Sequence, residues 1–200
     1  MRRVAWAWFL VFGACGGFAG QASAGVKVTE RTQNYEITGR TGAALLDAMD
    51  RRGPKHGFLT RAIAQTRYSV TWTIEWGETR SACRVKRADG ELTITYTYPH
   101  VAGGISPDLT RKWGKFFSGV KKHEETHGDL ARKMARAADR SVANLTIRDD
   151  PGCRKSRLEV KRRMAAIYAD YEARQIRFDA KEHREGGRVE GLIGALARRR

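Results

Sequence analysis

Two long helical patterns separated by one break constrain this sequence more than any other feature. The first runs over residues 106–145, with Pro107 at its opening turn and apolar side chains recurring at helical spacing. Residues 149–152, Asp-Asp-Pro-Gly, interrupt it, and a second pattern follows over residues 154–183. A short break between two long helices favours antiparallel packing of one against the other. The C-terminal half is therefore predicted to be a helical pair.

The segment before these helices is dominated by strand patterns. A helix capped by Thr41 and ending near Gly53 interrupts them. A turn is predicted at residues 88–90, with the strands on either side of it paired as a hairpin. The strands are expected at residues 26–37, 67–76, 83–85 and 92–98. The predicted fold class is α+β: an N-terminal antiparallel sheet with one small helix, followed by two long antiparallel helices.

Within the first long helix, residues 123–127 read His-Glu-Glu-Thr-His, an HExxH signature. Histidines four residues apart lie on one face of a helix, so both imidazoles can reach one metal ion. Neutral imidazole binds Zn²⁺ well, and the glutamate after the first histidine can serve as general base on a water at the metal. The pattern indicates His123 and His127 as zinc ligands and Glu124 as the catalytic base. The alternative is two exposed histidines on a charged helix.

A catalytic zinc ion usually has three protein ligands, and the HExxH segment supplies two. In a helical pair that turns near residue 150, residues facing each other have numbers that sum to about 301. The nearest donors opposite the HExxH segment are Asp179 and His183, themselves four residues apart. His183 is the expected third ligand, with Asp179 as alternate ligand or as a group that orients an imidazole. Glu172 is a weaker candidate.

The chain begins like an exported protein. Two arginines precede an apolar run, and an A-x-A motif at residues 22–24 predicts a signal peptide over residues 1–24, cleaved after Ala24. An uncleaved anchor is disfavoured because four glycines interrupt the run, and a lipoprotein attached at Cys15 is a further alternative. We expect a periplasmic or extracellular bacterial protein with no membrane span after cleavage.

Export also bears on the cysteines. Loss of the signal peptide removes Cys15 and leaves Cys83 and Cys153. An even number of cysteines in an exported chain favours one disulfide. A pair of metal-binding thiolates is disfavoured by their wide separation and by the absence of any C-x-x-C. We therefore expect Cys83 to be joined to Cys153.

The chain is strongly basic. Its formal net charge of +16 falls to +14 when Arg2 and Arg3 leave with the signal peptide. Such a charge suits anionic envelope polymers as partners, although cations spread along helices are equally typical of a solvated face. No specific nucleic-acid partner is expected. Residues 188–200, which end in three arginines, are predicted to be a basic C-terminal tail.

Several motifs along the mature chain together carry a resemblance to a known family. They are Tyr35-Glu36-Ile37-Thr38-Gly39, Gly53-Pro54, Trp72-Thr73-Ile74-Glu75-Trp76, Cys83, Tyr98-Pro99, Trp113, the HExxH segment, Cys153, Asp179 and His183. Together they resemble a bacterial family catalogued as a domain of unknown function and described as predicted secreted zinc-dependent proteases. The resemblance covers roughly residues 35–187 and implies a zincin-like metallopeptidase domain over residues 25–187. The family's tyrosine before the aspartate is Phe178 here, and its glycine after the histidine is Arg184.

These features predict a secreted or periplasmic zinc metallopeptidase, a hydrolase of peptide bonds in protein or peptide substrates. Zn²⁺ is the expected cofactor, and the strand at residues 92–98 is expected to offer an edge to an extended peptide. Tyr168, Tyr171 and His100 are the residues considered as oxyanion partner. Two alternatives differ in class: a non-catalytic basic envelope-binding protein with a structural metal, and a zinc amidase acting on cell-wall peptides.

Overall fold

The structure is a computed structural model that describes residues 25–56 and 60–198. The predicted signal peptide therefore lies outside the described residues. The elements are β1 (Val26–Ile37), α1 (Gly42–Arg52), β2 (Lys55–His56), β3 (Thr60–Arg61), β4 (Gln65–Glu78), β5 (Ala82–Val101), α2 (Pro107–Val142), β6 (Thr146–Arg148), the 3₁₀ helix η1 (Pro151–Cys153), α3 (Arg154–His183) and α4 (Arg188–Ala197). Within the described part of the chain, no helix is long and apolar enough to cross a membrane.

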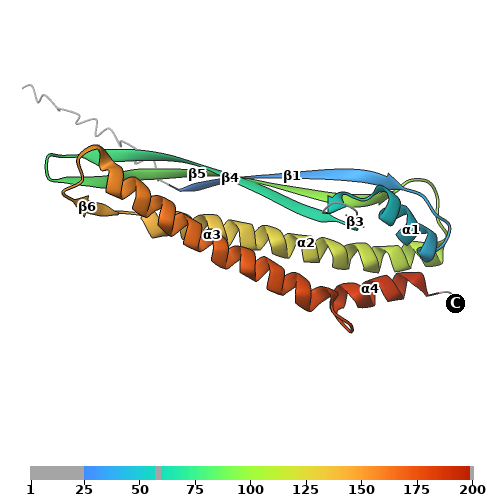
Figure 1. The fold of residues 1–200 in the computed structure, drawn as a ribbon. Helices are drawn as coiled ribbons and strands as arrows, with labels where there is room; N and C mark the ends of the chain where they lie inside the picture. The colour runs from blue at the N-terminus through green and yellow to red at the C-terminus, as the bar shows by residue number, and fades with distance from the viewer. Residues whose placement is uncertain (1–24, 57–59, 199–200) are drawn as a thin grey trace, which may run out of the picture.

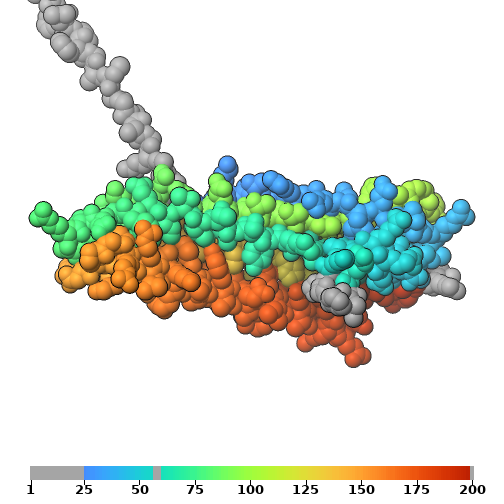
Figure 2. All heavy atoms as spheres, turned by 45° about the horizontal axis from the view of Figure 1, so that its top comes forward, coloured from blue at the N-terminus to red at the C-terminus, as the bar shows by residue number. Residues whose placement is uncertain are grey.

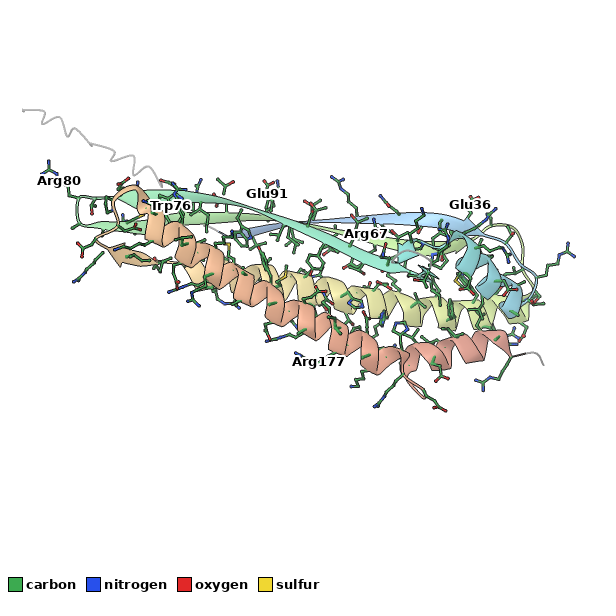
Figure 3. The ribbon with its side chains drawn as sticks, viewed as in Figure 1. Glu36, Arg67, Trp76, Arg80, Glu91 and Arg177 are labelled. Carbon is green, nitrogen blue, oxygen red and sulfur yellow. A yellow bond between two sulfur atoms is a disulfide. The ribbon has the colours of Figure 1, made fainter. Side chains whose placement is uncertain are left out.

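The molecule is an elongated two-layer α+β structure, which confirms the predicted mixture of helices and strands. Figure 1 shows the long strands on one side, with α2 and α3 running along them in opposite directions. Figure 3 shows Glu36 and Glu91 pointing away from the helices, so the outer face of the sheet carries charged side chains. The opposite face packs against α2 because every second residue of β5 from Leu92 to Tyr98 is apolar and buried.

The sheet is mixed, which corrects the predicted antiparallel arrangement. The strand order is β1-β5-β4, and β4 and β5 form an antiparallel hairpin. β1 instead pairs with β5 in parallel, from Val26 opposite Gly90 to Ile37 opposite Val101. The reason is the connection: α1 and β4 intervene between the two strands, so the chain reverses before β5 returns in the direction of β1.

The predicted turn at residues 88–90 is also wrong. These residues lie inside one continuous strand, β5, with Ala88 opposite Ile74 and Gly90 opposite Trp72. A side chain at Gly90 would begin 2.8 Å from the indole ring of Trp72. The glycine therefore makes room for an aromatic neighbour, and the hairpin turn lies before Ala82 instead.

The core divides into two apolar clusters along the length of the molecule. One cluster centres on Ile37, Ile94 and Phe116, and the other lies around Val142 and Met164. α2 reaches both because its 36 residues span about 54 Å. α2 and β5 thus join the two halves into one body, and the HExxH segment lies on α2 close to the first cluster.

A disulfide links the strand layer to the helix layer at one end of the molecule. The Sγ atoms of Cys83 and Cys153 are 2.06 Å apart, at bonding distance, and the two cysteines are 70 positions apart in the sequence. Cys83 lies at the beginning of β5, and Cys153 immediately precedes α3. The start of α3 is held further by Asp150, whose carboxylate accepts hydrogen bonds from the backbone amides of Lys155 and Ser156 at 2.8 Å.

Residues 188–197 form a packed helix, α4, where the sequence predicted a basic tail. Leu196 is 1% exposed. The side chain of Leu192 packs directly on Gly119 of α2, so closely that a Cβ atom added to this glycine would lie 2.4 Å from it. Two glycines inside α4 weaken its helical signal, so packing on α2 and α1 stabilises what local propensity does not.

Gly128 allows the HExxH helix to approach the sheet closely. A Cβ at this position would lie 2.0 Å from the hydroxyl oxygen of buried Tyr96. We expect Gly128→Ala to lower the free energy of unfolding by about 1–3 kcal/mol through overpacking, as measured by urea denaturation. Gly114→Ala is the matched control on the same helix, because nothing lies within 4 Å of a Cβ there. That control should gain about 1 kcal/mol from helix propensity. Equal losses in both variants would contradict the tight contact.

Candidate metal centre

His123 and Glu124 of the HExxH segment are buried because α2 presents them toward the sheet and α3. Ser106 caps the helix, its hydroxyl accepting from the amide of Leu109 at 3.3 Å. The apolar positions that follow turn one face of α2 toward β5. His123 and Glu124 lie at the edge of that face and are only 7% and 6% exposed. Two polar side chains held at such low exposure need partners.

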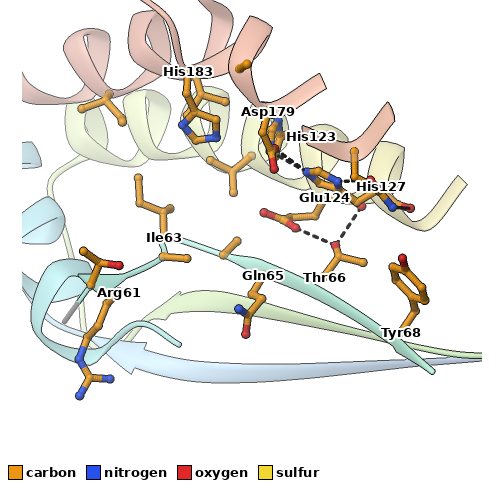
Figure 4. Close-up of a pocket in the computed structure, with 18 of the residues that line it drawn as sticks. Arg61, Ile63, Gln65, Thr66, Tyr68, His123, Glu124, His127, Asp179 and His183 are labelled. Atoms are coloured by element: carbon orange, nitrogen blue, oxygen red, sulfur yellow. Dashed lines mark hydrogen bonds and ion pairs between the residues drawn. The ribbon is translucent and has the colours of Figure 1, made fainter. Parts of the chain in front are cut away.

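The structure brings the predicted ligand residues of α2 and α3 together. The Nε2 atoms of His123 and His127 are 3.2 Å apart. Asp179 Oδ1 lies 2.8 Å from His127 Nε2 and 3.3 Å from His123 Nε2 (Figure 4). His183 is one turn further along α3 and more exposed, and its ring centroid is 5.2 Å from that of His123. One donor atom each from His123, Asp179 and His183 lies within 4.8 Å of the others.

The spacing of these donors fits a tetrahedral metal centre. With metal–ligand distances of 2.0–2.1 Å, two tetrahedral ligands lie roughly 3.3 Å apart. The separations among His123 Nε2, His127 Nε2 and Asp179 Oδ1 are 2.8, 3.2 and 3.3 Å. The three atoms therefore converge on a volume of the right size for one ion.

Gln175 fixes which nitrogen of His127 faces the cluster. Its amide nitrogen donates to the backbone carbonyl of His127 at 3.3 Å, and its Oε1 lies 2.5 Å from His127 Nδ1. Because the amide oxygen can only accept, Nδ1 must carry the proton. In a neutral imidazole the lone pair is then on Nε2, facing an Asp179 oxygen at 2.8 Å. Two acceptors this close require a proton or a metal cation between them.

The electrostatics of the cluster favour positive charge. Burial lowers the pKa of His127, but hydrogen bonds with Asp179 and Gln175 outweigh it and leave that pKa above its ordinary value. Burial opposes ionisation of Asp179, yet its hydrogen bonds with His123 and His127 hold its pKa well below the usual range. Burial and neighbouring His123 lower the pKa of His183, which favours its neutral form. The ionised carboxylate of Asp179 beside His127 therefore favours a positive charge between them, whether a proton or a metal cation.

His123 has a second polar atom that the fold leaves without a hydrogen bond. Its Nδ1 is buried and has no hydrogen-bond partner among the described residues. The closest carboxylate oxygen is Glu182 Oε2, at 3.8 Å. Phe178 stacks on the imidazole of His123, with ring centroids 4.9 Å apart, and contacts His127 edge-on. The Phe178 ring thus packs against both histidines and offers no hydroxyl group.

Glu124 is held by a residue that the sequence pattern did not single out. Thr66 Oγ1 of β4 lies 2.7 Å from Glu124 Oε2 and 3.0 Å from the backbone carbonyl of Glu124. The predicted strand began at residue 67, one position too late to include this threonine. The alternation of the strand could have identified Thr66, because this residue precedes Tyr68 by two positions and therefore lies on the same face of β4.

A cavity of about 720 Å³ opens beside these residues. In Figure 2, α2, coloured yellow, is visible in a hollow between β4 and α3. The lining side chains come from the β3–β4 segment, α1, α2, α3 and α4. They include Asp50, Arg61, Ile63, Gln65, Thr66, Tyr68, Val120, His123, Glu124, His127, Glu172, Gln175, Asp179, His183, Val189 and Ile193. The candidate donors and Glu124 therefore line one cavity large enough for a small ligand or a peptide segment.

The three residues considered as oxyanion partner do not line this cavity. Tyr168 accepts a hydrogen bond from the indole of Trp72 at 2.5 Å, in the other half of the molecule. Tyr171 is buried beneath the guanidinium of Arg174, and His100 is exposed near the end of β5. Tyr68, which the sequence assigned only to a strand face, lines the cavity instead.

The strand edge near the cavity belongs to β4. β5 lies between β1 and β4, so residues 92–98 offer no free edge, contrary to expectation. Among the described residues, no strand pairs with the other edge of β4. Gln65, Thr66 and Tyr68 of β4 line the cavity, which places this edge beside Glu124.

Fold and site together define an α+β protein in which an HExxH helix faces an aspartate and a histidine from a second helix. The chain belongs to the family described as "Bacterial protein of unknown function (DUF922)", which matches residues 32–187. That span contains every residue of the cluster but ends just before α4. Searches of curated proteins and of solved structures gave no match.

Proposed function

We propose that this protein is an exported zinc-dependent metallopeptidase that hydrolyses peptide bonds in the secreted or periplasmic space. The observation that carries the proposal is the convergence of His123, His127 and Asp179 at tetrahedral spacing beside buried Glu124. If the cluster served only to stabilise the fold, there would be no reason for Glu124, which does not contact the other donors, to line the same cavity.

His123, His127 and Asp179 would hold Zn²⁺, with His183 as a fourth donor that can approach from the last turn of α3. The distances favour Asp179 as third ligand over His183, the reverse of the order expected from the sequence. Bound Zn²⁺ would supply Lewis acidity, lowering the pKa of a water and polarising the scissile carbonyl. Gln175 orients the imidazole of His127, as groups behind metal ligands commonly do, and Glu182 places a carboxylate oxygen 3.8 Å from His123 Nδ1.

Glu124 is the general base. It accepts a proton from the attacking water as the new C–O bond forms, and returns a proton to the leaving amine as the C–N bond breaks. Thr66 donates its hydroxyl to Glu124 Oε2, which fixes the carboxylate and leaves the other oxygen for the water. The low exposure of Glu124 keeps bulk water from competing for the proton.

The free edge of β4 supports a peptide substrate. An extended peptide can pair with an exposed strand edge through backbone hydrogen bonds. Because this edge lies beside Glu124, such pairing would place a peptide bond within reach of the base. Cell-wall peptides would meet the same chemistry, so an amidase acting on them is a variant of this proposal.

Metal content tests the proposal directly. We expect one zinc per chain in the purified mature protein, measured by mass spectrometry of metals. His123→Ala should abolish stoichiometric binding, and Asp179→Ala should weaken it more than His183→Ala, because Asp179 is nearer both imidazoles. His100→Ala, an exposed histidine near the end of β5, is the matched control.

If the wild-type protein contained no zinc even after reconstitution, the HExxH sequence would be a coincidence. The basic surface would then make a non-catalytic binder of envelope polyanions the better account, and its binding should fall steeply with salt.

A further inference from the structure

Part of the cavity lining is aliphatic. Ile63 between β3 and β4, Val120 of α2, and Val189 and Ile193 of α4 contribute to it. Val120 and Val189 are each 4% exposed, and the other two are half-buried. Figure 4 shows Ile63 on the same side of Glu124 as His183, with Tyr68 at the opposite end. We call these four side chains the apolar wall.

The remainder of the cavity differs in character. Asp50, Glu124, Glu172 and Asp179 line it, and Arg61 is the one arginine or lysine among the described lining residues. The guanidinium of Arg61 donates to the carbonyl of Gly53 at 2.7 Å, and Figure 4 shows it directed away from Glu124. An anionic substrate side chain would therefore meet repulsion from these carboxylates, whereas an aliphatic one finds the largest aliphatic lining side chains at the apolar wall.

α4 is seated firmly enough to define the shape of this wall. Val189 and Ile193 are four residues apart and so share one helical face. The start of α4 is held by Glu190, whose carboxylate accepts from the amide of Gly186 at 2.6 Å. Leu192 packs against α2 at Gly119, and Leu196 is buried. Since the family match ends at residue 187, half of the wall comes from residues beyond the matched span.

We propose that the apolar wall is a substrate subsite that takes an aliphatic side chain next to the scissile bond, and that α4 sets this preference. The inference rests on the proposed peptidase function and adds to it the class of substrate: peptides with a leucine-like residue at one position beside the cleaved bond. Filling such a subsite discriminates by about tenfold or more between an aliphatic side chain and none.

Three small hydroxamates separate the subsite from the metal centre. Acetohydroxamate has no side chain beyond a methyl group, whereas leucine hydroxamate and aspartate hydroxamate add an aliphatic and an anionic one. Their binding to the zinc-loaded mature protein is measured by calorimetry. We expect leucine hydroxamate to bind about tenfold more tightly than acetohydroxamate, and aspartate hydroxamate no more tightly than acetohydroxamate.

Substitutions on α4 locate the effect. Ile193→Asp should reduce the leucine-to-acetohydroxamate affinity ratio about tenfold, and the milder Ile193→Ala should reduce it in the same direction. Ala195→Asp introduces the same charge at an exposed position of α4 and should leave the ratio unchanged. Thermal melts of each variant report whether α4 remains folded.

The outcomes are distinct. Equal affinities for the leucine and aspartate compounds, or an unchanged ratio in a folded Ile193→Asp variant, would overturn the subsite alone. Failure of acetohydroxamate to bind the zinc-loaded protein would overturn the proposed function itself, and the subsite with it.

Discussion

Replacing Glu124 with glutamine should abolish turnover while leaving the metal centre intact. Glutamine keeps the shape of the side chain, and its oxygen can still accept from Thr66, but it cannot take a proton from water. Loss of a general base costs about 10²–10⁴-fold in rate. We expect kcat/KM on a quenched fluorescent peptide to fall by that factor, with zinc content equal to wild type.

The next residue provides the control. Glu125 is exposed on α2, and its one ion pair among the described residues is with Lys121, at 3.7 Å between exposed side chains. Glu125→Gln should therefore retain full hydrolysis. If Glu124→Gln were as active as Glu125→Gln, Glu124 would have no part in the mechanism. If it lost zinc as well as activity, its role would be structural.

Removing the disulfide should cause the largest loss of stability. Joining Cys83 to Cys153 closes a loop of 70 residues, which constrains the unfolded chain by about 4 kcal/mol in the chain-entropy model. We expect urea denaturation of the Cys83→Ser/Cys153→Ser double variant to show a free energy of unfolding lower by about that amount. The free energy of unfolding of the wild type should fall similarly under reducing conditions. A loss below about 1 kcal/mol would contradict this estimate of the loop's contribution.

Zinc binding by the double cysteine variant should show whether the disulfide at the start of α3 affects the candidate metal centre near the end of this helix. Cys153 precedes the helix and Asp179 lies near its end, so about 39 Å of helix separates them. The double cysteine variant should therefore bind zinc as the wild type does under conditions in which it is folded. Loss of zinc together with the disulfide would instead mean that the start of α3 positions Asp179.

The helical half of the molecule could be predicted closely because its information is local. Periodicity placed the helices, and a single short break fixed their register, so Asp179 could be expected near His127 from numbering alone. The parallel pairing of β1 was missed because it depends on the path of the chain between distant strands. Gly90 was read as a turn because the indole that needs its space lies 18 residues earlier.

The parts of the site that escaped prediction are those defined only by contact. Gln175 is not a metal-binding residue type, and its role follows from its two hydrogen bonds with His127. Thr66 belongs to a strand, and only packing of β4 over α2 brings its hydroxyl to Glu124. Asp179 and His183 lie one helical turn apart on α3, and a slip of a few residues between α2 and α3, which periodicity does not resolve, decides which of them is nearer the HExxH segment.

The central position of β5 also sets an order of assembly. β4 and β5 are adjacent in the chain and can form their hairpin early, whereas β1 must wait for a partner that begins to pair 64 positions later. Because the chain is synthesised from its N-terminus, β1 emerges before β4 and β5. It therefore spends the longest time unpaired, with its edge exposed to other chains, before β5 arrives to cover it.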